Sequence, residues 1–114
     1  MNRSYSLKRH KEFRYTYRVG RSQSLPLLTL VVAKSRSATV RVGFSVSKRV
    51  GNAVQRNRAK RRMRASITPM VDHLKGGCNI VFIAKPEVLD APFEELQKQM
   101  ETLLRRGGVW ESEA

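Results

Sequence analysis

KRVGNAVQRNRAKRRMR, residues 48–64, places eight Lys and Arg within seventeen positions in the middle of the chain. Asn52 is a typical helix N-cap residue, and no Gly or Pro follows it before Pro69. Because Ala, Arg, Lys, Gln and Met favour helix, the stretch predicts a helix over residues 52–67. At 100° per residue its core-facing stripe is narrow: Ala59, Met63, Ser66 and Ile67.

Apolar segments on both sides of this helix predict strands. Residues 27–33 (LLTLVVA) and 78–84 (CNIVFIA) read as buried strands, and residues 39–47 (TVRVGFSVS) alternate between two faces. The strands 27–33 and 39–47 are close enough in sequence to form an antiparallel hairpin. Since the basic helix crosses from 39–47 to 78–84, those two strands are candidates for parallel pairing.

Two amphipathic helices complete the pattern. Residues 7–20 (LKRHKEFRYTYRVG) form the first, with Gly20 at its end. Residues 91–106 form the second, with Pro92 in the first turn and Gly107–Gly108 as the stop. The apolar stripes of the two helices are Leu7, Phe13, Tyr17 and in part His10, and then Phe93, Leu96, Met100, Leu103 and Leu104.

The order of elements is therefore helix, strand, strand, helix, strand, helix, with a further short strand possible near 21–26. A sheet covered by helices is the simplest way to bury the apolar faces of these elements. We expect an α+β fold, an α/β sandwich with a central sheet, in which residues 1–114 form a single domain.

The positive charge is concentrated in the N-terminal half. Residues 1–64 hold 18 basic and 1 acidic side chains (+17), and residues 65–114 hold 5 and 8 (−3), which together give +14. Such asymmetry indicates a polyanionic partner. Like charges at i, i+4 destabilise a free helix, and bound phosphates would remove that cost. We therefore interpret helix 52–67 as a polyanion-binding helix rather than a solvated face.

Several other classes of protein are not indicated. No apolar run reaches the roughly 18–20 residues of a spanning helix, and no apolar signal segment follows the N-terminus. Cys78 is the single cysteine, and His10 and His73 have no ligand spacing around them. We expect a cytoplasmic protein with no membrane partner, no metal site and, lacking clustered carboxylates, no catalytic residue of its own.

Aromatic residues among cations favour RNA as the polyanion. Phe13, Tyr15 and Tyr17 lie between Lys and Arg residues, a mixture suited to stacking on unpaired bases. From the residues alone, Phe13 and Tyr17 serve equally well as core anchors of the first helix. A structural RNA-binding protein of ribosomal type also fits the size and charge.

The segment VGFSVSKRVGNAVQRNRAKRRMR closely resembles the signature of the bacterial ribonuclease P protein subunit. The matching positions are Asn52-Ala53-Val54, Arg56-Asn57, Lys60-Arg61 and Arg64. LKRHKEF near the start resembles the family's opening helix. The resemblance covers most of the chain and weakens after residue 86.

This resemblance implies a cofactor role. In the family a large RNA is the catalyst, and the holoenzyme, an endoribonuclease, removes 5′ leaders from precursor tRNA. The implied partners are ribonuclease P RNA and precursor tRNA, with one protein per RNA subunit and Mg²⁺ required by the holoenzyme. The resemblance also implies a left-handed crossover around the basic helix, which is rare on general grounds.

The resemblance assigns residues to two surfaces. A cleft between the first helix and the sheet face would hold the single-stranded leader, and the alternation in 39–47 independently gives that face polar serines. The family often has an aromatic residue where Val31 stands here, so stacking would be lost at that point. The catalytic RNA would contact Lys48, Arg49, Asn52, Arg56, Asn57, Arg58, Lys60, Arg61 and Arg64. The leader cleft would include Phe13, Tyr17, Ser45, Ser47, Lys8, Arg9 and Arg14.

Overall fold

Four strands form one mixed sheet in the computed structural model, which describes residues 5–111. The spatial order is β1-β2-β4-β3. β2 pairs antiparallel with both β1 and β4, and β3 pairs parallel with β4. The α+β fold, the strand at 78–84 and the short strand near 21–26 are confirmed. The strands are β1 (Arg21–Ser24), β2 (Leu28–Lys34), β3 (Arg41–Ser45) and β4 (Cys78–Ala84).

The predicted hairpin between strands 27–33 and 39–47 is wrong, because β4 lies between β2 and β3. Val81 of β4 is in register with Val31 on one side and with Gly43 on the other. β4 is apolar and buried along nearly its whole length, as expected for a central strand whose two faces are both covered by helices. The parallel pairing of β3 with β4 is confirmed, and the handedness of their crossover stays a prediction.

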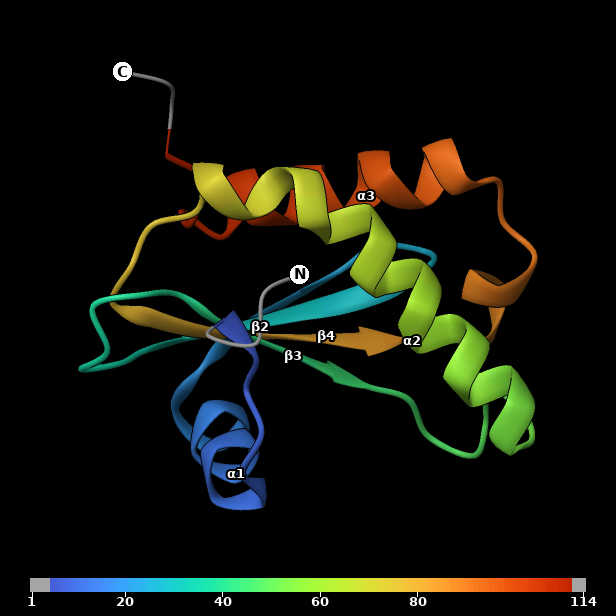
Figure 1. Ribbon diagram of the computed structural model, residues 1–114, viewed down its shortest axis with the longest axis horizontal. Helices are drawn as coiled ribbons and strands as arrows, with labels where there is room; N and C mark the ends of the chain where they lie inside the picture. The colour runs from blue at the N-terminus through green and yellow to red at the C-terminus, as the bar shows by residue number, and fades with distance from the viewer. Residues whose placement is uncertain (1–4, 112–114) are drawn as a thin grey trace.

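Three α-helices cover the sheet (Figure 1). α2 (Ala53–Ile67) and α3 (Phe93–Arg106) lie over one face, and α1 (His10–Val19) lies on the opposite face. Two short 3₁₀ helices, η2 (Thr68–His73) and η3 (Pro86–Leu89), follow α2 and β4. No helix within residues 5–111 is long and apolar enough to span a bilayer.

The main core lies between the sheet and the α2/α3 layer. Side chains of alternate strand residues, such as Leu30, Ile80 and Phe82, are fully buried there. The core-facing residues predicted for α2 are all buried, which confirms that prediction. Of the apolar residues predicted for α3, Phe93 is the exception, because it is 39% exposed. Burial of each large side chain stabilises the fold by about 1.5–3 kcal/mol. The buried helix residues are Ala59, Met63, Ser66, Ile67, Leu96, Met100, Leu103 and Leu104.

The basic helix α2 begins at a complete capping box, as its sequence predicts. Asn52 Oδ1 accepts a hydrogen bond from Gln55 N (2.9 Å), and Asn52 N donates one to Gln55 Oε1 (2.8 Å). These bonds satisfy backbone donors that a helix start leaves free. The cap fixes the direction in which the cationic helix leaves β3.

The first helix begins later than predicted. Leu7 is not in α1 but in an extended segment along the edge of β3, where its N–H donates to Val42 O (2.8 Å). Its side chain is buried, which the apolar pattern indicates correctly. α1 ends at Gly20, where the backbone becomes extended. A side chain would not fit at this position, since a Cβ would lie 2.4 Å from Thr16 O and 2.6 Å from a Val31 methyl.

Candidate RNA interface

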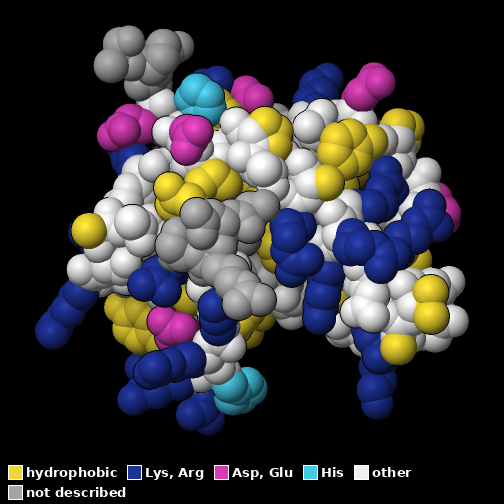
Figure 2. Space-filling model, in the orientation of Figure 1, with side chains coloured by type: hydrophobic (Ala, Val, Ile, Leu, Met, Phe, Trp, Pro, Cys, Tyr) yellow, Lys and Arg dark blue, Asp and Glu magenta, His cyan; other side chains and the backbone are white. Residues whose placement is uncertain are grey.

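A row of cations follows the flank of α2 that borders β3. Arg56, Lys60 and Arg64 recur every fourth residue beside the buried stripe. The guanidinium of Arg64 lies over the ring of Phe44 in β3, 5.7 Å from its centroid. Figure 2 shows Lys and Arg side chains gathered over α2, while acidic side chains lie mostly near α3. We call Arg56, Lys60, Arg61 and Arg64 the α2 stripe.

The cations of α2 have no carboxylate partner among residues 5–111. The ion pair found in this part of the chain joins Arg105 to Glu101 on α3 (2.9 Å). The mutual repulsion of the α2 cations is therefore not offset by an ion pair among the described residues. A helix with fixed, unpaired guanidinium groups is suited to bind a row of phosphates.

Arg62 has a structural role. Its Nη1 donates to the carbonyls of Val88 (2.7 Å) and Leu89 (2.9 Å), and its Nη2 donates to that of Ala91. The side chain thereby fastens the η3 segment to α2. Arg56 has a smaller internal role, with Nη1 donating to Gly51 O (2.9 Å).

The remaining residues predicted to contact the catalytic RNA surround the same helix. Lys48 and Arg49 are exposed in the turn that leads into α2, and Asn57, Arg58 and Arg61 are exposed along it. Asn52 lies at the start of the helix, but its side-chain oxygen is used in the cap. The structure thus brings this predicted set together on one element and its entry turn.

A second surface lies where α1 packs on the sheet. The ring of Phe13 is half-buried against Gly43, and its centroid is 6.3 Å from that of Tyr17. The Tyr17 side chain is 42% exposed. Phe13 therefore acts in part as the core anchor considered above, whereas Tyr17 is open to a ligand. We call this flank of α1, with the adjoining sheet face, the α1 cleft.

The sheet face that adjoins this flank of α1 carries a row of half-buried residues across three strands. Thr29, Ile83 and Ser45 are in register from β2 through β4 to β3. Val31 is 5% exposed, so it presents no surface on which a base could stack. Ser47 is not on the strand face, because β3 ends at Ser45 and the Ser47 hydroxyl accepts from Arg49 N (3.3 Å).

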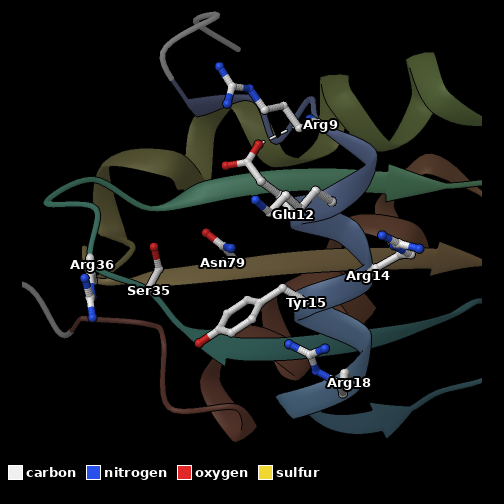
Figure 3. A pocket seen from close by; sticks show the side chains of 9 residues that line it. Arg9, Glu12, Arg14, Tyr15, Arg18, Ser35, Arg36 and Asn79 are labelled. Carbon is white, nitrogen blue, oxygen red and sulfur yellow. Dashed lines mark hydrogen bonds between the residues drawn. The ribbon is translucent and has the colours of Figure 1, made fainter.

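Two of the cations assigned to the cleft, Lys8 and Arg9, lie apart from its aromatic residues. Lys8 lines a recess together with Arg64 and Phe44, next to the α2 stripe. Arg9 lines a groove on the flank of α1 that carries Tyr15, and Arg14 borders the same groove although its side chain projects from the opposite side of the helix (Figure 3). Sequence spacing could not show this, because the flank on which a long side chain lies depends on how α1 is rotated on the sheet.

The described residues contain no group of three or more His, Cys, Asp or Glu side chains placed to hold a metal ion. Cys78 is buried at the start of β4, and its thiol donates to Lys75 O (3.3 Å). Burial raises the pKa of the Cys78 thiol, an effect that the nearby Lys75 charge partly offsets.

Comparison with known proteins gives one consistent result. Residues 1–108 match the family described as Ribonuclease P. The ribonuclease P protein component of Chloroflexus aurantiacus is 48% identical over 107 residues, covering 93% of this chain and 79% of that protein. The corresponding component of Symbiobacterium thermophilum is 38% identical over 114 residues, covering 99% of each. The solved RNase P protein of Staphylococcus aureus superposes with a TM-score of 0.84 at 28% identity, covering 94% and 98%.

Proposed function

Since the chain belongs to the ribonuclease P protein family, we propose that it serves its holoenzyme by holding two RNAs on two surfaces. The α2 stripe binds ribonuclease P RNA, and the α1 cleft binds the 5′ leader of precursor tRNA. The protein is then a cofactor, and the RNA subunit performs the hydrolysis. The ribosomal-type alternative is not favoured, because the family match covers residues 1–108.

The observation that carries this proposal is the unpaired charge of α2. Its cations are fixed on a capped helix, they border β3, and none has a carboxylate partner within the described residues. RNA phosphates supply the missing negative charge, and releasing their counterions drives association. Helix rigidity lets several side chains bind successive phosphates at once, without each contact ordering a new segment.

The α1 cleft suits a different ligand. Tyr17 offers an exposed ring beside Phe13, and the adjoining sheet face at Ser45 and Thr29 offers hydroxyl groups. A single strand with unpaired bases can stack on such a ring, whereas a paired helix cannot. We therefore assign the cleft to the leader, which is the unpaired part of the substrate.

The holoenzyme requires Mg²⁺ in this proposal, and the ion serves the RNA subunit. The RNA subunit would hold the ion, which would there supply metal-assisted hydrolysis of the phosphodiester bond. One protein per RNA subunit satisfies the proposal, since one α2 stripe and one α1 cleft are enough. The complex acts in the cytoplasm, where precursor tRNA is made.

A reconstitution assay tests the cofactor role. Precursor tRNA is incubated with the protein alone, with ribonuclease P RNA alone, and with both, across a range of Mg²⁺ concentrations. We expect the protein alone to produce no mature 5′ end at any concentration, and the combination to produce it. Leader removal by the protein alone, persisting after contaminating RNA has been fully digested, would overturn the proposal.

A further inference from the structure

A second groove lies on the flank of α1 that carries Glu12 and Tyr15 (Figure 3). It has a volume of about 920 Å³ and is bounded by α1, by β4 and by the loop after β2. Figure 3 shows Tyr15 extending from α1 across the sheet, with Ser35 and Arg36 on the far side of the gap. We call it the loop-side groove.

The groove is strongly cationic. Five Lys and Arg side chains line it, against one carboxylate, that of Glu12. No ion pair to these cations occurs within residues 5–111. The groove therefore favours an anion. Its lining cations are Arg9, Lys11, Arg14, Arg18 and Arg36.

Asn79 gives the groove a buried hydrogen-bond acceptor. The residue is 5% exposed, and its Nδ2 donates to Thr16 Oγ1 (3.4 Å). The single Thr16 hydroxyl proton is already donated to Glu12 O (2.8 Å), so Thr16 can only accept from Asn79. This fixes the amide orientation and leaves Asn79 Oδ1, at the groove lining, without a donor among the described residues. A phosphate group has no N–H to donate to this acceptor, whereas a nucleobase has.

Tyr15 supplies a fixed aromatic ring in the same groove. Its hydroxyl donates to Lys34 O (3.0 Å), which ties the side chain from α1 to the end of β2. The side chain is nevertheless 38% exposed. A ring held in place but open to solvent is suited to stack on a base without further ordering.

We infer that the loop-side groove binds an unpaired nucleotide of ribonuclease P RNA. The base stacks on Tyr15 and donates a hydrogen bond to Asn79 Oδ1, and the flanking phosphates pair with Arg36, Arg18 and Lys11. The volume of the groove is in the range of small-molecule sites. This inference rests on the proposed function and adds a third RNA-binding surface to it.

The position of the groove favours the RNA subunit over the leader. The body of α1 separates it from Tyr17, so a strand in the α1 cleft lies on the other flank. In the opposite direction cations are continuous: Arg64 of the α2 stripe shares a recess with Lys8, and the next residue, Arg9, lines the groove. An RNA bound along α2 can therefore reach the loop-side groove past the N-terminal end of α1.

Affinity measurements with matched variants test the inference. Tyr15→Ala and Arg36→Ala are each assayed for binding to ribonuclease P RNA, and then, as reconstituted holoenzyme at saturating protein, for binding to precursor and mature tRNA. Loss of one stacked base should weaken RNA-subunit binding by roughly 5- to 150-fold for Tyr15→Ala. Loss of one phosphate contact in Arg36→Ala should reduce the slope of log affinity against log salt by about 0.7–0.9. The ratio of precursor to mature tRNA affinity should stay unchanged.

Further variants keep the result interpretable. Lys98→Ala, which removes an exposed cation of α3, should leave RNA binding unaltered, and Tyr15→Phe should retain most of the affinity because the ring remains. Asn79→Leu keeps the volume but removes the acceptor, so it should weaken binding while melting shows a folded protein. Wild-type affinity in Tyr15→Ala and Arg36→Ala would overturn the inference, as would a loss confined to precursor tRNA. If the α2 stripe variants bound normally as well, the proposed function itself would fail.

Discussion

Phe13 lies directly over Gly43, so closely that a Cβ on Gly43 would lie 2.6 Å from Cζ of the Phe13 ring. The same Cβ would lie 3.2 Å from Cβ of Leu7. The absence of a side chain at this one position of β3 therefore lets α1 approach the sheet. It also sets how closely Tyr17 approaches the sheet, because Tyr17 follows Phe13 by one helical turn.

We predict that Gly43→Ala moves α1 away from β3. The added methyl group overpacks a tight contact, which typically costs about 1–3 kcal/mol of unfolding free energy. Urea denaturation measures this loss. Ser45→Ala, two residues along the same face of β3, is the matched control and should change stability by less than about 1 kcal/mol. Equal stability of wild type and Gly43→Ala would show that α1 yields without cost.

Arg61 and Arg62 are neighbours in sequence, but we predict that Arg62→Ala lowers stability and that Arg61→Ala lowers RNA affinity. Arg62→Ala leaves three backbone carbonyls of residues 88–91 without their charged donor, and hydrogen bonds to charged groups contribute about 1.5–3 kcal/mol. We expect Arg62→Ala to lose stability of that order in thermal or urea melts. Arg61→Ala should melt as the wild type does and instead lose RNA affinity. A stable Arg62→Ala variant would mean that the η3 segment does not need this clamp.

The difference between these two arginines marks a limit of sequence reasoning. Periodicity identified the buried stripe of α2 because hydrophobic residues report burial directly. Both arginines lie outside that stripe, and nothing in their spacing distinguishes a solvent-facing guanidinium from one that binds backbone carbonyls. That distinction depends on the η3 turn, which lies more than twenty residues away in sequence.

The strand order shows the same limit at the level of the fold. The strands near 27–33, 39–47 and 78–84 follow from composition and alternation. Their pairing does not, because adjacency in sequence favours a β2–β3 hairpin, whereas the strand that is buried on both faces, β4, lies in the centre. Burial of β4 between β2 and β3 is therefore more favourable than the short connection that a β2–β3 hairpin would have.

The salt dependence of RNA binding tests the α2 stripe. Replacing Arg56, Lys60 and Arg64 with Ala removes about three phosphate contacts, so the slope of log affinity against log salt should flatten by roughly two to three units. Filter binding or fluorescence anisotropy between low and moderate salt measures the slope. Three alanines also favour helix, so α2 should remain formed in circular dichroism. An unchanged slope would show that these side chains do not contact phosphate.

The buried thiol of Cys78 should be protected in the folded protein. The thiolate is the reactive form, and the raised pKa of Cys78 lowers its population at neutral pH, while burial limits access. We expect alkylation by iodoacetamide to be much slower in buffer than in denaturant, with mass spectrometry as the readout. Rapid alkylation of the native protein would show that the start of β4 opens readily.

The sequence predicted only part of the RNA-binding surfaces. The density of cations and the signature between residues 42 and 64 indicated RNA binding and the helix that performs it. The division of the α1 residues between two flanks was not predictable, because it depends on which face of α1 meets Gly43 and Asn79. Asn79 carries no signal of its own, as a lone polar residue within an apolar strand is compatible with many roles.

The separation of two RNA surfaces is the central claim, and a single comparison tests it most directly. Holoenzymes reconstituted with wild-type, Tyr17→Phe or Tyr17→Ala protein are titrated with precursor tRNA and with mature tRNA. Tyr17 is 42% exposed and lies outside the main core, so all three proteins should melt alike. We predict that Tyr17→Ala weakens precursor binding by roughly 5- to 150-fold, that Tyr17→Phe does not, and that mature tRNA and RNA-subunit affinities stay unchanged. Equal weakening for precursor and mature tRNA, or none for either, would contradict the account.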